Sequence, residues 1–543
     1  MDIPTRKLEK AALAIILIGF VIWSAGFIYR SSFIAIDGKR YFCLFDDSMI
    51  SMRYAWNFSH GSGLVWNPGE RIEGYTNLLM TLLMSFATLV FDKSTAALFI
   101  QILGVGFMLG IAYTSMRIAD HIVQDENYQH KALIRVLSFF FALSYYPLAF
   151  WSLMGMETGL LTLLLLLGIL SAFNCTRDNN SALLLLVAVC LGLAYLTRND
   201  SIIFAILIWL YITSETSVPK TNRKSLWQLF AAISLFFLFV IGQLVFRYLY
   251  YGELLPNTYT LRLTGMPLLA RIRDGVGFIT PFLIGTTFIL VLSCMNLVFD
   301  FRKQKLLLLS IVFSAIGYQI YIGGDPWIYW RIMSPSMPLT AILFTCQVRA
   351  IVDAITSIRA FSVYFLRNPI FPKKYVAEVL VILLTLIGLI FANKLFLPQI
   401  SLLVKPYTAN DNENNVNTAI AVSDLTTSGA TVGVYWAGSI PYFTGRRAID
   451  FLGKSDRYIA HLPPDFNENV SWPRMQSVPG HNKYDLNYSI KTLQPTFVQG
   501  FRWGVQDLSE WGNTHYIKVE YYGISLCFLK DSPSVFWSKI YVP

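Results

Sequence analysis

The feature that most constrains this chain is a series of apolar segments, each close to the length a helix needs to cross a bilayer. A transmembrane helix takes about 20 mostly apolar residues. Hydrophobic residues make up 55% of the sequence and charged residues 14%, whereas soluble domains carry about 25% charged residues. The pattern predicts a polytopic α-helical membrane protein. Twelve candidate segments lie at roughly 11–29, 78–91, 95–117, 132–151, 157–174, 181–195, 200–213, 226–247, 276–299, 305–322, 331–352 and 376–397.

Basic residues between these segments predict the orientation of the chain. The connections at 219–225, 300–305 and 348–375 are rich in Lys and Arg, so the positive-inside rule places them in the cytoplasm. The same rule explains the net charge of +10, and we therefore do not expect nucleic-acid binding. The N-terminus has a basic start and an apolar run without a small-residue cleavage site, which predicts a retained signal anchor with a cytoplasmic N-terminus.

The number of candidate segments does not agree with this orientation. With the N-terminus inside, an even number of crossings has to precede Pro219, whereas seven candidates precede it. One candidate therefore does not cross, and the expected total falls to about eleven. Residues 78–91 form the shortest segment and are a candidate for a re-entrant or interfacial piece, although the sequence leaves open which segment it is.

The composition changes at Pro398. Residues 398–543 are polar, with Asn, Asp, Gly and Pro throughout, and contain no long apolar run. Within them "ATVGVYW" is typical of a buried strand, and "HYIKVEYYGISLCFL" of an alternating strand or a hairpin. We expect a soluble α/β or α+β domain over 398–543, on the outer side, that follows a transmembrane domain over 1–397.

The first outer loop, within residues 30–77, holds a dense polar cluster in the stretch "FDDSMISMRYAWNFSHGSGLVWNPGERIEGYTN". Its glycines predict tight turns with positive φ. The adjacent carboxylates of Asp46 and Asp47 suit general acid–base chemistry, because like-charge repulsion raises one pKa of such a pair. The alternative for one of them is the start of a helix, where Asp is a favoured N-cap.

Several other span ends also carry charged residues. Charges that face one cavity at span ends are functional candidates. Two interpretations stay open: one shared catalytic or transport cavity, or unrelated loops in which Glu157 and Asp325 form structural ion pairs with Arg198 or Arg331. The six cysteines have no zinc-binding spacing, and no glycine-rich nucleotide motif is present, so we expect neither a metal nor another cofactor.

The stretch at 45–77 closely resembles the first extracytoplasmic loop of bacterial membrane glycosyltransferases of the GT-C superfamily. The nearest group is the mycobacterial terminal β-(1→2) arabinofuranosyltransferase family. The resemblance covers nearly the whole chain, and where that family commonly has "RPDG" this chain has Arg198-Asn199-Asp200-Ser201. The further matching motifs, in order, are "WSLMGMETGL", "LTRNDSIIF", "YYGELLPNTY", "GGDPWIYWRIMSPSMPL", "GSIPYFTGRRAIDFLGKSDRYIAH" and "PGHNKYD".

The resemblance implies a GT-C fold with about eleven transmembrane helices in the bacterial inner membrane, and an active site on the periplasmic side. It implies an enzyme that moves a pentose, D-arabinofuranose, from a polyprenyl-phosphate donor. The acceptor would be a hydroxyl of a cell-envelope glycan or of a protein such as pilin. A transferase for another lipid-linked sugar, such as mannose or another hexose, is the first alternative, and a transporter of lipid-linked saccharides is the second.

Roles for individual residues follow from the resemblance together with the chemistry of a lipid-phosphate donor. The catalytic carboxylate is Asp46 or Asp47. Arg198, Arg262 and Arg331 are the expected phosphate ligands, because a planar guanidinium binds phosphate oxygens in pairs. For Tyr75 and Trp327 an interfacial aromatic role is the alternative. The expected sugar- and acceptor-binding residues are Glu73, Tyr75, Glu157, Asn257, Tyr259, Asp325, Trp327, His461 and His481.

Overall fold

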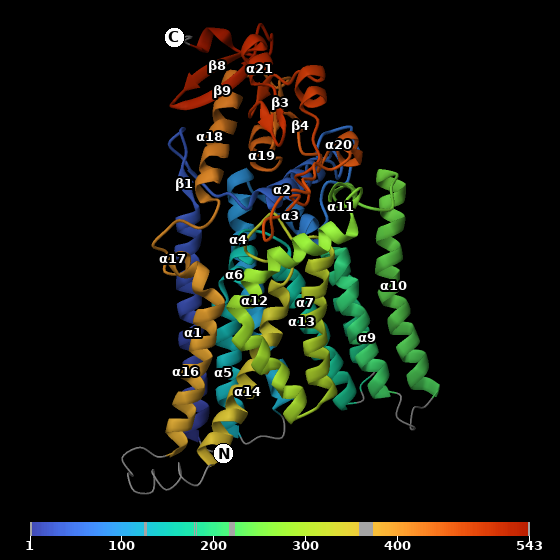
Figure 1. Cartoon of the computed structure of the whole chain (residues 1–543), viewed down its shortest axis with the longest axis vertical. Coiled ribbons are helices and arrows are strands. Elements are labelled where there is room, and N and C mark those ends of the chain that lie inside the picture. The colour runs from blue at the N-terminus through green and yellow to red at the C-terminus, as the bar shows by residue number, and fades with distance from the viewer. Residues whose placement is uncertain are drawn as a thin grey trace.

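The computed structural model describes residues 3–123, 128–178, 180, 182–216, 223–357 and 373–540. Long apolar helices form a bundle, and an α/β domain is seated on one end of it (Figure 1). Parts of the basic connections predicted at 219–225 and 348–375 lie outside the described residues. We call the end that carries the α/β domain the domain-bearing end.

Eight helices in the described ranges are long and apolar enough to span a membrane. A ninth span is the pair α5 (Tyr128–Ser144) and α6 (Tyr146–Leu153), bent by 55°, and two shorter apolar helices, α8 (Ala182–Thr197) and α9 (Ile202–Thr216), complete the bundle. With α8 and α9 the bundle has eleven apolar segments in the described ranges, and eight or nine of them are long and apolar enough to span a membrane. The eight long helices are α1 (Ile3–Ser31), α4 (Lys93–Ile122), α7 (Thr158–Asp178), α10 (Arg223–Tyr251), α12 (Leu268–Phe299), α13 (Lys303–Tyr321), α14 (Met337–Ser357) and α16 (Lys373–Asn393).

The segment expected at 78–91 does not cross. It forms α3 (Leu78–Val90), whose 13 residues reach only about 20 Å at 1.5 Å per residue. Asn77, just before α3, donates to Glu157 at 3.1 Å, and Lys93, just after it, donates to the carbonyl of Phe443 in the α/β domain at 3.1 Å. Both ends of α3 therefore lie at the domain-bearing end, which resolves the count made from the sequence.

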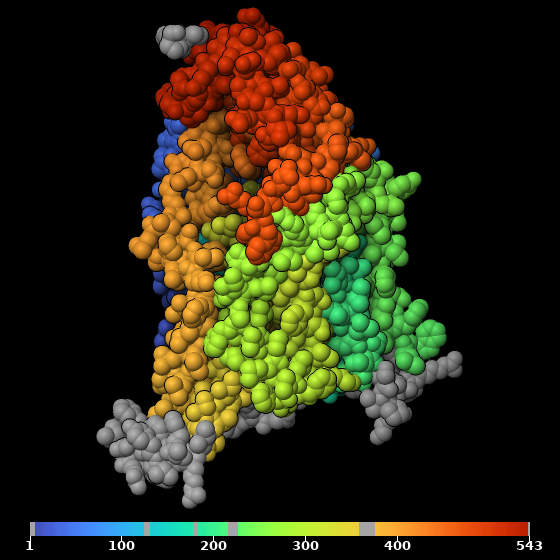
Figure 2. Space-filling model, in the orientation of Figure 1, coloured from blue at the N-terminus to red at the C-terminus, as the bar shows by residue number. Residues whose placement is uncertain are grey.

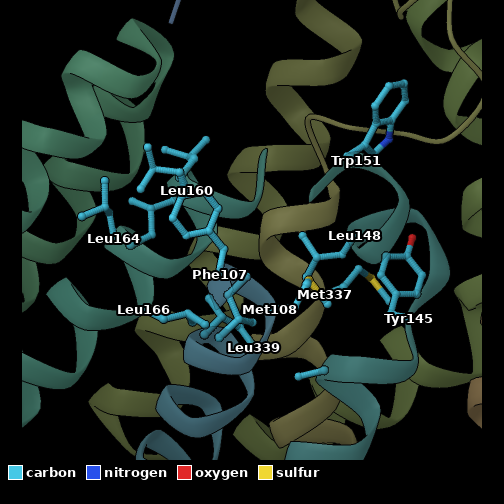
Figure 3. Packing of buried hydrophobic residues seen from close by; sticks show 14 of the residues in the cluster. Phe107, Met108, Tyr145, Leu148, Trp151, Leu160, Leu164, Leu166, Met337 and Leu339 are labelled. Carbon is cyan, nitrogen blue, oxygen red and sulfur yellow. The ribbon is translucent and has the colours of Figure 1, made fainter. Parts of the chain in front are cut away.

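The core of the bundle lies where α4, α6, α7 and α14 meet. Phe107 and Met108 of α4 are buried against apolar side chains of the other three helices (Figure 3). Pro147 lies in the first turn of α6, where it is tolerated, and its ring prevents α5 from continuing as a straight helix. Beyond the bend, the end of α6 contacts the loop that follows α1, where the N–H of Phe45 donates to the carbonyl of Met154 at 3.0 Å.

The α/β domain contains a five-stranded sheet of order β4-β3-β5-β9-β8. β3 (Thr431–Val434) lies parallel to β4 (Arg447–Asp450) and β5 (Phe497–Val498), whereas β8 (Tyr516–Tyr521) and β9 (Ile524–Leu529) form an antiparallel hairpin. The strand expected in "ATVGVYW" is confirmed, and of the two alternatives expected for "HYIKVEYYGISLCFL", a single strand or a hairpin, the structure has the hairpin. The helices of this region are α17 (Leu397–Ile400), α18 (Ala409–Leu425), α19 (Ser439–Thr444), α20 (Arg457–His461) and α21 (Ser509–His515).

The carboxyl ends of the parallel strands face the bundle, and buried polar contacts fix the domain there. Trp66 donates its indole N–H to the carbonyl of Ala437, after β3, at 3.1 Å. The buried guanidinium of Arg53 donates to the carbonyl of Arg446, before β4, at 2.7 Å. Figure 2 shows the domain covering this end of the bundle, with a recess between the orange segment at α17–α18, the red-orange domain and the yellow-green helices.

Candidate active site

The first outer loop folds into a compact unit below the α/β domain. α2 (Asp46–Ser59) is followed by turns in which Gly61, Gly63 and Gly69 have φ of 80°, 87° and 86°. The tight turns that the glycines predict are therefore confirmed, because this region of φ favours glycine. The turns return the chain beneath the strands β3 and β4 and place α2 beside the bundle axis.

A cavity of about 420 Å³ lies between this loop, the helix ends and the α/β domain. Its lining combines charged and polar residues with apolar ones. The charged and polar residues include Asp47, Ser51, Asn77, Glu157, Arg198, Asn199, Asp200, Arg247, Arg262, Arg331, Lys454 and His481. The apolar residues include Ile202, Ile203, Leu244, Leu255, Leu261, Leu263 and Ile322, from α9 to α11 and the end of α13.

The structure brings together most of the residues predicted from the sequence. Those that line the cavity are Asp47, Arg198, Arg262, Arg331, Tyr75, Glu157, Tyr259 and His481. Those that do not are Asp46, Glu73, Asn257, Asp325, Trp327 and His461. The aspartate pair and the three arginines thus lie at one site, with one member of the pair facing the cavity.

Asp46 and Asp47 have different surroundings. Asp46 is buried and accepts hydrogen bonds from the backbone N–H of Gly438 at 3.2 Å and of Ser439 at 2.9 Å, so it caps the start of α19 and ties α2 to the domain. Burial raises its pKa, and these hydrogen bonds partly offset the effect. Asp46 therefore has a structural contact of its own, whereas Asp47 faces the cavity.

Three donors converge on the Asp47 carboxylate. They are Lys454 Nζ at 2.5 Å, Arg331 Nη1 at 3.1 Å and Trp327 Nε1 at 3.3 Å. Burial favours a higher pKa for Asp47, but the charges of Lys454 and Arg331 outweigh it and hold the pKa well below its ordinary value. Asp47 is therefore ionised in this arrangement and is a poor base while both cations stay in place.

Asp325 links two of the predicted phosphate ligands. Its buried carboxylate lies 2.9 Å from Arg331 Nε and 3.4 Å from Arg262 Nη2. Arg262 also donates to the carbonyl of Gly324 at 2.7 Å, and its Nε is buried without a hydrogen-bond partner. Asp325 therefore orients two guanidinium groups toward the cavity from behind. The ion pair that the sequence left as an alternative for Asp325 is present.

Arg198 also lines the cavity and is held by two carboxylates. Its Nη1 donates to Glu157 at 2.8 Å, and its Nη2 contacts Asp200 at 2.5 Å. The second Glu157 oxygen accepts from Asn77 at 3.1 Å. Arg198 thus forms the ion pair with Glu157 that the sequence allowed, and all four side chains line the cavity. The turn that departs from the family's "RPDG" pattern keeps its arginine and aspartate in contact.

Glu73 forms a buried ion pair with Arg247, with side-chain exposures of 5% and 2%. Arg247 Nη2 also donates to Asn199 at 3.0 Å and lines the cavity, so Glu73 supports an arginine rather than facing a ligand. Tyr75 is buried, and its hydroxyl accepts a hydrogen bond from Tyr251 at 3.1 Å. It therefore does not lie on the exposed surface, where an interfacial aromatic residue would lie.

The remaining predicted residues have distinct positions. Asn257, at the start of α11 (Asn257–Leu263), donates to the carbonyls of Gly453 at 2.9 Å and Lys454 at 3.0 Å. Tyr259 is 44% exposed on the same helix. His461 is exposed at the end of α20 and lies off the cavity lining.

Lys454 and Arg247 were not predicted from the sequence. Lys454 follows β4, in the turn that Asn257 holds from below. The signal for Lys454 was its position after a parallel strand, where ligands commonly bind. For Arg247 the signal was a charged residue near the end of an apolar span. No group of three or more His, Cys, Asp or Glu suited to a metal occurs in the described ranges.

Comparisons with known proteins place the chain by its fold. Residues 407–530 match a family model described as "Domain of unknown function (DUF8728)", and no curated protein matches the sequence. ArnT from Cupriavidus metallidurans, in its crystal structure with bound undecaprenyl phosphate, is 11% identical to this chain. The match covers 83% of this chain and 86% of the ArnT chain, with a TM-score of 0.53. The apo form of the same protein is 12% identical, and the match covers 80% of this chain and 84% of the ArnT chain with a TM-score of 0.50.

An oligosaccharyltransferase from Archaeoglobus fulgidus, tethered to an acceptor peptide, is 11% identical. The match covers 82% of this chain and 64% of the oligosaccharyltransferase chain, with a TM-score of 0.47. The likeness to the two ArnT structures carries the conclusion about the fold. The chain has the GT-C fold, with a polytopic helical domain and a C-terminal α/β region.

Proposed function

We propose that this protein is a membrane glycosyltransferase that uses a polyprenyl-phosphate-linked sugar. The observation that carries the proposal is one cavity whose lining combines Asp47 and three arginines with apolar residues. Such a donor needs cationic groups for its phosphate, a carboxylate at the reacting centre, and an apolar surface for the start of its tail. The undecaprenyl phosphate bound to ArnT, which shares the fold, supports this class of donor.

Arg198, Arg262 and Arg331 are the proposed phosphate ligands, and Lys454 is a fourth. All four line the cavity, and the arginines are oriented by Glu157, Asp200 and Asp325. Guanidinium groups stabilise the negative charge that develops on the leaving phosphate oxygens. The apolar lining residues of α9 to α11 would receive the first isoprene units.

Asp47 is the proposed base. In the free protein its pKa is held low by Lys454 and Arg331. A phosphate that enters the cavity competes for these two cations, and their withdrawal raises the pKa of the carboxylate. Binding of the donor therefore prepares Asp47 to accept a proton from the acceptor hydroxyl.

The proposed step balances without a further reactant. The bond between the anomeric carbon and the phosphate oxygen breaks, and its electron pair stays on the phosphate. A bond forms between the acceptor oxygen and the anomeric carbon. The hydroxyl proton passes to Asp47 and then to the released phosphate, whose second pKa of about 6 lets it share a proton near neutral pH. The products are a glycosylated acceptor and a polyprenyl phosphate.

The sugar and the orientation rest on the sequence. The resemblance favours a pentose, D-arabinofuranose, with mannose or another hexose as the alternative, and an acceptor hydroxyl on a cell-envelope glycan or a protein such as pilin. The basic connections favour a cytoplasmic position for the opposite end of the bundle. The cavity and the α/β domain would then lie on the periplasmic side of a bacterial inner membrane.

The test is a transfer assay with purified protein in detergent. Polyprenyl-phosphate-arabinose and polyprenyl-phosphate-mannose are each supplied with an arabinan oligosaccharide and with a pilin peptide. We expect transfer from at least one donor. Asp47→Asn should lower the transfer rate at least a hundredfold, because general-base catalysis typically contributes about 100- to 10,000-fold to a rate. Asp424→Asn, an exposed aspartate of α18, is the matched control. Full activity of Asp47→Asn would remove the proposed role.

A further inference from the structure

The carboxyl ends of the three parallel strands meet next to Asp47. β4 is followed by Lys454, β3 by Tyr435 and Trp436, and β5 by a short turn that leads to Trp503. In sheets of this kind ligands bind outside the carboxyl ends of parallel strands. One such residue, Lys454, already contacts the catalytic carboxylate. The other two strands supply aromatic side chains to the same edge.

These aromatic side chains form a continuous group that ends at Asp47. The rings of Trp503 and Trp436 are 6.1 Å apart, and those of Trp436 and Trp327 are 6.0 Å apart. Trp327 is buried and donates its indole N–H to Asp47, whereas Trp436 and Trp503 keep part of their surface exposed. Tyr435 stacks on Trp503 at 5.0 Å. The group thus extends from the reacting centre into the α/β domain.

His481 adds a polar atom with no partner at this corner. Its side chain is 7% exposed and lines the cavity, and its ring lies 5.7 Å from Trp327 and 6.2 Å from Trp436. Nδ1 lies 3.4 Å from the carbonyl of Pro479, which can only accept, so that nitrogen carries the hydrogen. Nε2 is buried, has no hydrogen-bond partner and is left as an acceptor.

We propose that this corner is the acceptor subsite and that its acceptor is a saccharide, an inference that rests on the proposed transferase function. Nε2 of His481 accepts a hydrogen bond from a neighbouring hydroxyl of the acceptor sugar, and so holds beside Asp47 the hydroxyl that will be glycosylated, whose own hydrogen points to the Asp47 carboxylate. The rest of the sugar packs against the exposed surface of Trp436 and Trp503. Apolar and aromatic walls with one or two placed polar groups are typical of a neutral small-ligand site.

The sheet topology favours a saccharide over a peptide at this edge. Extended peptides bind by adding a strand to an exposed sheet edge. β3 lies between β4 and β5, and β5 between β3 and β9, so neither strand offers a free edge at the aromatic group. The free edges of the sheet belong to β4 and β8.

The test uses saturation-transfer NMR on the full-length protein in detergent, with arabinan, mannan and galactan oligosaccharides as probes. We expect at least one probe to bind. Its dissociation constant should rise at least tenfold in His481→Phe, which keeps the ring but removes Nε2, and in Trp436→Leu. Trp436→Phe should recover most of the affinity. Trp511→Leu, a partly exposed tryptophan on α21 at the far end of the domain, is the matched control (Figure 1).

Binding of undecaprenyl phosphate, followed on the same samples by thermal shift, separates this proposal from the proposed function. We expect wild type and Trp436→Leu, a residue outside the cavity lining, to bind it within twofold of one another. If the wild type does not bind undecaprenyl phosphate, the proposed function fails. If it does, but no saccharide binds or both variants keep full saccharide affinity, the acceptor subsite alone is overturned.

Discussion

Replacing Lys454 by Met tests the proposal that the α/β domain takes part in donor binding. Lys454 Nζ lies 2.5 Å from Asp47, and the two side chains are only 14% and 17% exposed. The turn that carries Lys454 is fixed, because the Asp450 carboxylate accepts from the backbone N–H of Leu452 at 3.0 Å and of Ser455 at 2.7 Å. The substitution keeps most of the aliphatic stem and removes only the charge.

A hydrogen bond to a charged group contributes about 1.5–3 kcal/mol. Lys454 has to exchange its contact with Asp47 for one with phosphate, so the net effect should lie near the lower bound, which corresponds to about tenfold in affinity. Asp47 keeps Arg331 and Trp327 as partners in the variant, and the fold should persist. We therefore expect Lys454→Met to weaken undecaprenyl phosphate binding about tenfold.

The assay is isothermal titration of undecaprenyl phosphate into protein in detergent, with wild type, Lys454→Met and Lys454→Arg side by side. The Arg variant keeps the charge and should recover part of the affinity. Lys405→Met removes a lysine whose pair with Glu413 is exposed, and should have no measurable effect. An affinity within twofold of wild type for Lys454→Met would refute the reasoning.

Three further outcomes follow from contacts around the cavity. Glu73→Gln should lower the free energy of unfolding by about 3–5 kcal/mol in detergent, because it leaves the buried charge of Arg247 without its carboxylate partner; a change below about 1 kcal/mol would contradict this. Asp46→Ala should cost about 1–3 kcal/mol of stability by leaving the N–H of Ser439 unpaired, yet keep transfer per folded molecule; lost transfer at full stability would return a catalytic role to Asp46. Burial, with the charge of Lys454, lowers the pKa of His481 to about 3 in the folded protein, against about 6.5 when unfolded. The free energy of unfolding should therefore fall by at most about 1.4 kcal/mol per pH unit as the pH is lowered from 6.5 to 3. In His481→Phe this contribution to the pH dependence of the free energy of unfolding should be absent.

The arrangement of the bundle was largely predictable from the sequence. Hydrophobic length fixes where helices cross, and the parity of the basic connections requires one segment to remain on one side. The sequence could not identify α3 as that segment with certainty, since α8 and α9 are nearly as short. Contacts distant in sequence, from Asn77 to Glu157 and from Lys93 to Phe443, decide the question.

The chemical types at the site were also predictable, but their partners were not. Charges at span ends indicate one site, and the three arginines do line one cavity. Nothing in the local sequence distinguishes Asp46 from Asp47. They are neighbours at the start of α2, and only contacts with Ser439 and Lys454, some 400 residues later, give each different surroundings. The signal for Lys454, its position after a parallel strand, becomes visible only once the sheet is known.

The most direct test of the central claim is a structure of the protein with bound undecaprenyl phosphate. Our account predicts a phosphate inside the cavity, within hydrogen-bonding distance of at least one of Arg198, Arg262 and Arg331, with Lys454 moved from Asp47 toward it. A phosphate bound outside the cavity, with the contact between Lys454 and Asp47 intact, would contradict the account.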